Sequence, residues 1–304
     1  MIEAQGLTKR YRSTLAVDDL TFDVRAGTVT GFLGPNGAGK STTMRMILGL
    51  DRPTAGQVRI DGRRYGELRH PLRTVGALLD AKWVHPNRSA RSHLRWLARS
   101  TALPAARVDE VLDAVGLTAV AGKRAGTFSL GMSQRLGIAG ALLGDPQVLL
   151  FDEPVNGLDP EGILWIRRFM QRLAGEGRTV FVSSHLLSEM ALTATELVVI
   201  GRGRLIAQGP TSEFVNGAAG ATVLVRAARL DALAAVLRAD GLVVTEVPGE
   251  AALTVAGTTT EHVGELAAAN GLALHELALR RGSLEEAFME ITKQDVEYAT
   301  EAVA

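Results

Sequence analysis

One segment constrains this chain more than any other: Gly34-Pro35-Asn36-Gly37-Ala38-Gly39-Lys40-Ser41. It fits the pattern G-x-x-x-x-G-K-[ST] of a phosphate-binding loop. Such a loop needs a strand before it and a helix after it, and the sequence predicts both. Residues 29–33 are mostly apolar and lie between glycines, as in a buried strand. Apolar residues then recur at helical spacing from Met44 to Leu50.

The residue types in this loop suit phosphate chemically. Glycines allow backbone N–H groups to gather around phosphate oxygens, and the start of the following helix adds the positive end of its dipole. Lys40 can reach β- and γ-phosphates, and the Ser41 hydroxyl can bind Mg²⁺. We therefore expect the chain to bind the phosphates of a nucleotide.

Composition sets few further limits. The 304 residues suffice for one large domain or two smaller ones. The formal net charge is zero, so nothing indicates nucleic acid as the main partner. The absence of cysteine excludes disulfides, thiol catalysis and cysteine-bound metal.

The sequence shows no segment typical of membrane insertion. No apolar run approaches the roughly 20 residues that a membrane-spanning helix needs. Residues 1–5 lack the basic region and apolar core of a signal peptide. We therefore expect a cytosolic protein whose role at a membrane, if any, requires a partner.

Two acids follow a buried strand. Residues 148–151 are all apolar and run directly into Asp152 and Glu153. In open α/β sheets, ligands bind at the edge where such strands end. Asp152 would hold Mg²⁺ through water, and Glu153 would polarise an attacking water. The alternative is a pair of acids that only caps a strand.

Polar residues follow other predicted strands. His185 comes after residues 179–184, where it could lie near a γ-phosphate or serve as a capping or core histidine. Asp80 ends a buried strand predicted over residues 73–80. Tyr11 could stack on an adenine ring, or it could only cover the end of a strand.

Residues 81–145 are predicted to form a helical insertion between strands of the core sheet. Within it, Ser129, Leu130 and Gly131 stand at the start of a helix, where a small polar residue and a glycine can hold an anion. Many helices begin in this way, so the motif is weak when taken alone.

In this order, the motifs resemble the nucleotide-binding subunit of an ABC transporter over residues 2–215. The resemblance implies that Tyr11 stacks on adenine and that His185 is the switch histidine. It implies that Asp152 and Glu153 are the Walker B acid and the catalytic glutamate. It also implies a Walker A loop that holds ATP, formed by Gly34, Pro35, Asn36, Gly37, Ala38, Gly39, Lys40, Ser41 and Thr42.

The resemblance also covers the family's sequence motifs that act across the interface between two subunits. Residues 128–132 fall on the LSGGQ signature, with Ser129 and Gly131 at its γ-phosphate-binding positions. Residues 156–159 match the D-loop, which ends in Asp159. Two chains would thus enclose two ATP·Mg²⁺ head to tail as a homodimer or with a paired ATPase subunit.

Two departures resemble a subfamily of drug- and antibiotic-export ATPases. Asp80 falls where the family has a glutamine that contacts Mg²⁺ and senses the membrane partner. In the signature, Leu130 and Met132 replace a glycine and a glutamine. This subfamily drives separate ABC-2-type permeases, so we expect a permease to dock near residues 80–100. The chain would lie in the cytoplasm, peripheral to the inner face of the cell membrane.

Other functions use the same loop. A soluble ABC ATPase acting on nucleic acid or ribosomes usually carries two cassettes or a long coiled-coil insertion, and this chain shows neither. A nucleotide kinase or GTPase would not require Ser129 and Gly131 shortly before Asp152 and Glu153. The preferred interpretation is the motor subunit of an exporter for a drug, antibiotic or other hydrophobic compound.

We expect an α/β fold in residues 1–217, with a core sheet, an antiparallel β subdomain and the helical subdomain at about 81–145. Residues 218–292 follow the order β-α-β-β-α-β of a small ferredoxin-like α+β domain. Capping boxes at Thr258 and Ser283 would begin two of its helices. This domain could stabilise a dimer, regulate the enzyme or sense a ligand. Residues 293–304 are expected to be a flexible tail.

Overall fold

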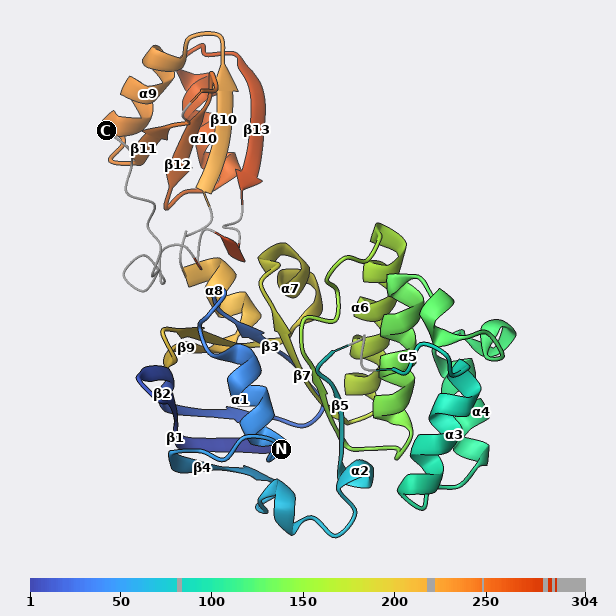
Figure 1. Ribbon diagram of the computed structural model, residues 1–304. Coiled ribbons are helices and arrows are strands. Elements are labelled where there is room, and N and C mark those ends of the chain that lie inside the picture. Colours follow the sequence, from blue (N-terminus) through green and yellow to red (C-terminus); the bar gives the residue numbers. More distant parts are fainter. Residues whose placement is uncertain (81–83, 218–221, 248, 281–283, 286–287, 289–304) are drawn as a thin grey trace. The chain divides into compact units, whose positions relative to one another are not determined.

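The computed structural model describes residues 1–80, 84–217, 222–247, 249–280, 284, 285 and 288. Contacts within the chain divide it into two compact units, one formed by Met1–Pro210 and one that begins at Thr211. Each unit is described by itself (Figure 1). The predicted tail and most of the helix predicted from Ser283 lie outside the described residues.

A six-stranded sheet forms the centre of the first unit. Its first five strands are parallel, and the last is antiparallel. This confirms the predicted α/β class. In spatial order the strands are β5 (Val75–Leu78), β6 (Val148–Phe151), β7 (Thr179–Ser184), β3 (Val29–Leu33), β8 (Glu196–Gly201) and β9 (Arg204–Pro210).

A second, antiparallel sheet has the order β2 (Thr14–Val24), β1 (Ile2–Tyr11), β4 (Ala55–Ile60). It is the predicted antiparallel β subdomain. Leu20, Phe22 and Val24 alternate with more exposed residues along β2, which is the period of two that predicted the strand. This sheet therefore buries one face.

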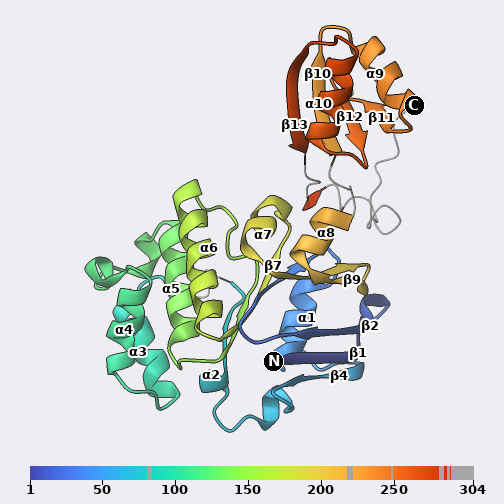
Figure 2. The same ribbon diagram turned by 180° about the vertical axis from the view of Figure 1, so that it is seen from behind.

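Helices lie around the six-stranded sheet. In both views α5 lies between α6 on one side and α3 and α4 on the other (Figure 1, Figure 2). Short 3₁₀ turns occupy Tyr65–Glu67, Thr118–Val120 and Ala125–Thr127. The helices of this unit are α1 (Lys40–Ile47), α2 (Pro71–Thr74), α3 (Ala90–Ser100), α4 (Ala106–Ala114), α5 (Leu130–Leu142), α6 (Pro160–Gly175) and α7 (Leu187–Thr193).

The predicted strand over residues 73–80 is shorter than expected. Pro71 begins the short helix α2, which takes residues up to Thr74 and leaves only Val75–Leu78 for β5. Asp80 is exposed and lies two residues beyond the strand. It therefore does not end the strand directly, as the sequence predicted.

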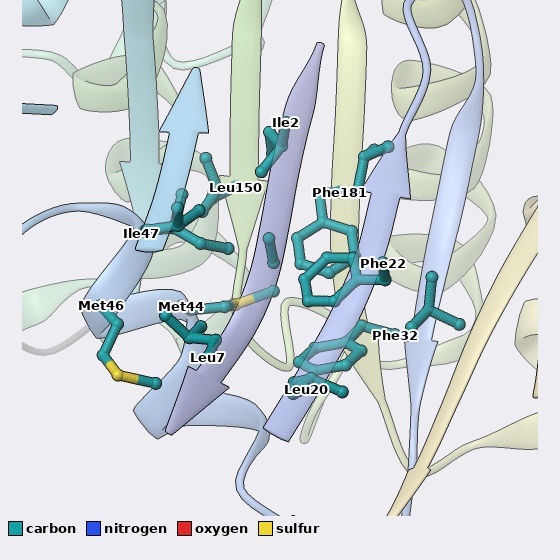
Figure 3. Close-up of a cluster of buried hydrophobic side chains, with 14 of the residues drawn as sticks. Ile2, Leu7, Leu20, Phe22, Phe32, Met44, Met46, Ile47, Leu150 and Phe181 are labelled. Carbon is teal, nitrogen blue, oxygen red and sulfur yellow. The ribbon is translucent and has the colours of Figure 1, made fainter. Parts of the chain in front are cut away.

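Three phenylalanines join the two sheets in the core (Figure 3). Phe22 comes from β2, Phe32 from β3 and Phe181 from β7. Their ring centroids lie 4.9–5.7 Å apart, and all three side chains are buried. Burying each ring stabilises the fold by about 1.5–3 kcal/mol, and the ring contacts add to this.

Helix α5 lies unusually close to strand β5. A Cβ atom at Gly76 would stand 2.0 Å from the carbonyl oxygen of Ala141. A Cβ atom at Gly137 would stand 2.5 Å from Cδ1 of Leu78. Glycine is therefore required at Gly76, where the obstacle is backbone, whereas a side chain at position 137 would have to displace the end of Leu78.

The second unit begins with α8 (Thr211–Gly217) and contains a four-stranded antiparallel sheet of order β11-β12-β10-β13. The chain order β-α-β-β-α-β confirms the predicted ferredoxin-like fold. Its elements are β10 (Thr222–Ala227), α9 (Leu230–Ala239), β11 (Val243–Glu246), β12 (Leu253–Ala256), α10 (Thr260–Ala269) and β13 (Leu274–Arg280).

One helix cap in this unit was predicted wrongly. The N-cap of α10 is Thr259, whose hydroxyl accepts a hydrogen bond from the backbone N–H of His262 at 3.3 Å. The predicted cap, Thr258, lies one residue earlier. Two successive threonines precede this helix, and spacing to Glu261 alone did not select the correct one.

Among the described residues, no helix combines the length and apolar character needed to cross a membrane.

Replacing Phe181 with alanine should lower the free energy of unfolding by about 3–5 kcal/mol, because the cavity would open between both sheets. Leu192→Ala is the control, since Leu192 is 59% exposed. It should change stability by no more than about 0.5 kcal/mol. Urea denaturation of both variants measures the difference, and equal losses would contradict the assigned core.

His93 on α3 should make stability depend on pH. Burial, assisted by the Arg88 charge, lowers its pKa from 6.5 to about 4. Between these values the unfolded chain binds a proton that the folded chain does not bind. The free energy of unfolding should therefore fall as the pH falls through this window, by up to about 3 kcal/mol.

Denaturation at several pH values tests this expectation. His93→Leu should remove much of the loss between about pH 7 and pH 4.5. His275→Leu, at an exposed position on β13, should keep the dependence of the parent protein. An unchanged pH dependence in His93→Leu would refute the role of His93.

Candidate functional site

The predicted phosphate loop connects β3 to α1, as the motif requires. Gly37 and Gly39 have φ of 83° and 101°, which few other residues adopt. A Cβ atom at Gly39 would stand 2.5 Å from the carbonyl oxygen of Ala16, and one at Gly34 would stand 2.5 Å from that of Ile200. The loop is thus a tight glycine cradle that fits phosphate groups.

The Lys40 side chain is held inside this loop. Its ammonium donates to the carbonyl oxygens of Gly34 at 2.6 Å and Pro35 at 3.3 Å. It also lies 3.7 Å from Oε1 of Glu153. Burial lowers the pKa of Lys40, and the carboxylates of Glu153 and Asp152 oppose that shift. The Lys40 ammonium group therefore faces Glu153, and the Asp152 carboxylate lies close enough to act on its pKa.

The acids and the histidine meet where β6 and β7 end. The two strands pair in register up to Phe151 and Val182. Nδ1 of His185 lies 2.8 Å from Oε2 of Glu153. An ionised carboxylate can only accept a hydrogen bond, so Nδ1 carries the hydrogen in this arrangement.

Ser183 connects the two acids. Its hydroxyl lies 2.5 Å from Oδ1 of Asp152 and accepts a hydrogen bond from the backbone N–H of Glu153 at 2.9 Å. Glu153 has φ of 48°, in the left-handed region that a residue other than glycine rarely adopts. Contacts with Ser183, Lys40 and His185 hold it there.

Tyr11 is anchored by Asp51, which follows α1. Its hydroxyl donates to Oδ2 of Asp51 at 2.7 Å, and Nε of Arg45 on α1 donates to the same oxygen at 2.8 Å. The hydrogen bond to Asp51 raises the pKa of Tyr11, while Arg45 and Tyr11 lower the pKa of Asp51. Nζ of Lys9 lies 4.8 Å from the centre of the Tyr11 ring. Tyr11 is 42% exposed.

Ser129, Gly131 and Asp159 lie together in a groove of about 500 Å³. Ser129 caps α5 by accepting from the N–H of Met132, and Asp159 caps α6 by accepting from the N–H of Gly162. No residue of the phosphate loop is among those lining the groove. The predicted site therefore falls into two groups of residues.

The predicted metal ligands are not arranged as a complete cage. Ser41 is exposed at the loop, and Asp152 is half-buried. Among the residues that the structure describes, no three acids or histidines form a metal cluster, so Asp80 does not complete one with Asp152. Mg²⁺ usually takes one or two carboxylates and completes its shell with water and phosphate. Ser41 and Asp152 suit that mode of binding.

Sequence reasoning missed Ser183 and Asp51. Only His185 was predicted at this strand end, although the register of β6 against β7 would place Ser183 beside Asp152. Finding it required knowing which strands are neighbours. Asp51 lies 40 residues from Tyr11 in the sequence, and no local pattern connects the two.

Comparisons with known proteins identify the family. The family described as ABC transporter matches residues 17–156, and a domain of unknown function, DUF8746, matches residues 221–285. The bacitracin transport ATP-binding protein BcrA of Bacillus licheniformis is 44% identical over 213 residues, covering 69% of this chain and 70% of BcrA. The Nod factor export ATP-binding protein I of Ralstonia nicotianae is 36% identical over 231 residues, covering 74% of this chain and 71% of that protein.

A solved structure agrees with these relatives. The cbiO1 subunit from Clostridium perfringens, part of the ABC transporter complex cbiONQ, superposes with a TM-score of 0.63 at 28% identity. The superposition covers 70% of this chain and 89% of that chain.

The loop geometry predicts the effect of a single methyl group. Gly39→Ala should lower the free energy of unfolding by about 1–3 kcal/mol, because Gly39 combines a positive φ with a backbone contact. Gly175→Ala is the matched control, since a Cβ atom there meets nothing within 4 Å. It should change stability by no more than about 0.5 kcal/mol. Equal stability of both variants in urea would contradict the tight loop.

Proposed function

The chain belongs to the ATP-binding subunits of ABC transporters, and from this premise we propose that it is the ATP-hydrolysing motor of an exporter. The observation that carries the proposal is the meeting of Lys40, Glu153 and His185 at one edge of the sheet. A phosphate-binding cation, a carboxylate base and a histidine bonded to that base can together bind a γ-phosphate and activate water against it.

ATP would lie across α1. The ring of Tyr11 stacks on adenine, and the backbone N–H groups of the loop hold the phosphates. The participating loop residues are Gly34, Pro35, Asn36, Gly37, Ala38, Gly39, Lys40, Ser41 and Thr42. Lys40 binds the β- and γ-phosphates, where its charge offsets the charge that develops as the bond breaks.

Hydrolysis then depends on Glu153 and His185. Glu153 orients a water molecule and accepts its proton as the water oxygen bonds to the γ-phosphorus. The bond from that phosphorus to the bridging oxygen breaks, and ADP leaves with the electron pair. His185 fixes the Glu153 carboxylate through Nδ1. Ser41 and, through water, Asp152 would hold Mg²⁺, which would neutralise charge on the phosphates when bound.

The second group of residues supports a head-to-tail dimer. Ser129, Gly131 and Asp159 share one groove, and phosphate-loop residues do not line it. A nucleotide held by Lys40 in one chain can therefore meet Ser129 and Gly131 of another. Two ATP·Mg²⁺ would lie between two cassettes and hold them together, and hydrolysis would allow the two cassettes to separate.

A separate ABC-2-type permease would dock near residues 80–100, of which 81–83 lie outside the described residues. Helix α3 offers an exposed aromatic surface there. Trp96 is 49% exposed, and the Arg88 guanidinium lies 4.8 Å from the centre of its ring. Through the permease the chain would lie at the inner face of the cell membrane, in the cytoplasm.

The names of the relatives support the direction and the class of cargo. One is a bacitracin transport protein, and another a Nod factor export protein. We therefore propose export of a drug, antibiotic or other hydrophobic compound. The second unit, with its own core, would stabilise the dimer or regulate the motor.

The decisive variant is Glu153→Gln, which keeps the size of the side chain and removes the base. With ATP and Mg²⁺, it should form a dimer in light scattering, and its kcat should fall at least about 100-fold. Pulled down from detergent-solubilised native membranes, it should retain a multi-spanning membrane protein.

Two controls accompany this experiment. Glu176→Gln changes an exposed acid of a surface ion pair and should behave like the parent protein. The double variant Lys40→Ala, Glu153→Gln should stay monomeric, because it lacks the phosphate-binding cation. Recovery of only soluble partners or ribosomal material would reject the exporter role, and a monomer with bound ATP would reject the dimer.

A further inference from the structure

We infer that Ser183 is a positioning residue for ATP hydrolysis, because its hydroxyl ties the side chain of Asp152 to the backbone of Glu153. The inference rests on the proposed function, in which these two acids act on Mg²⁺ and on the attacking water. Ser183 itself would touch neither the nucleotide nor the water.

The direction of both hydrogen bonds follows from the groups involved. An ionised carboxylate only accepts, and a backbone N–H only donates. The Ser183 hydroxyl must therefore donate to Oδ1 of Asp152 and accept from the N–H of Glu153. One hydroxyl satisfies both demands, and neither partner allows the reverse arrangement.

Glu153 needs such an anchor. Its φ of 48° is strained for a residue with a side chain, and the direction in which its carboxylate leaves the backbone depends on that angle. The N–H bond to Ser183 supports this conformation on the backbone, whereas Lys40 and His185 contact only the carboxylate. Losing the anchor would allow the backbone to relax and move the base.

The position of Ser183 is itself well determined. It has no exposed surface and pairs in register with Phe32 of β3. A buried hydroxyl in the middle of a sheet cannot be replaced by solvent without a rearrangement. The next residue, Ser184, is equally buried but has another role, since its hydroxyl accepts from the N–H of Leu186 at 2.9 Å.

These two serines form a matched pair of test sites. In Ser183→Ala, kcat should fall about 10- to 100-fold, a loss typical of a misplaced general base. KM and the affinity for a fluorescent ATP analogue should change by no more than about twofold, because the phosphate loop is untouched. Ser184→Ala should keep kcat within about threefold of the parent protein.

Two further variants separate hydrogen bonding from packing. Ser183→Thr keeps the hydroxyl, and β-branched residues suit strands, so it should restore kcat to within about threefold. Ser183→Cys fills the same space with a weak hydrogen-bonding group and should be as slow as Ser183→Ala. Melting temperatures of all variants identify any that fail to fold. If Ser183→Ala does not fold, the comparison of Ser183→Thr with Ser183→Cys decides the inference.

A double-mutant cycle with Glu153→Gln tests whether Ser183 acts through Glu153. Removing the hydroxyl should cost far less in the Glu153→Gln background than in the parent protein. Additive losses would overturn the inference, as would a kcat of Ser183→Ala within twofold of the parent or equal activity of the Thr and Cys variants. Failure of Glu153→Gln itself to lower kcat would instead reject the proposed function.

Discussion

The in-register parallel hydrogen bonding of β3, β6 and β7 is the constraint on which the rest of this structure depends. Parallel strands end at a common edge, so residues that follow three separate strands meet there although they lie far apart in the sequence. Lys40, Glu153 and His185 are brought together in this way. A shift of one residue in the pairing of β6 with β7 would direct Asp152 and Ser183 to opposite faces and separate the groups of the site.

That register is held by packing on the side of the sheet where the antiparallel subdomain lies. Phe32 and Phe181 come from neighbouring parallel strands, and Phe22 reaches them from the other sheet. Sliding one strand past another would break these ring contacts as well as the hydrogen bonds. The core therefore stabilises the fold and fixes the alignment of the catalytic groups through the same contacts.

The sequence predicted the phosphate loop, the buried strands and the strand-end residues because each is encoded within a few consecutive positions. It also predicted the order of elements in the second unit. Features that depend on neighbours in space were missed or misplaced. Ser183 is recognisable only once β6 and β7 are known to be adjacent, and Asp51 only once it meets Tyr11. Asp80 lies beyond its strand because the competing helix α2 shortens β5.

The close approach of α5 to β5 has a mechanical consequence. Helix α5 begins directly after Ser129, and its later turns lie on β5, where the Leu78 side chain meets Gly137 and the backbone at Gly76 meets the backbone at Ala141. At Gly76 the helix and the strand touch backbone to backbone. A displacement applied at the Ser129 end of the helix would pass through this contact to β5 and to Asp80 beyond it.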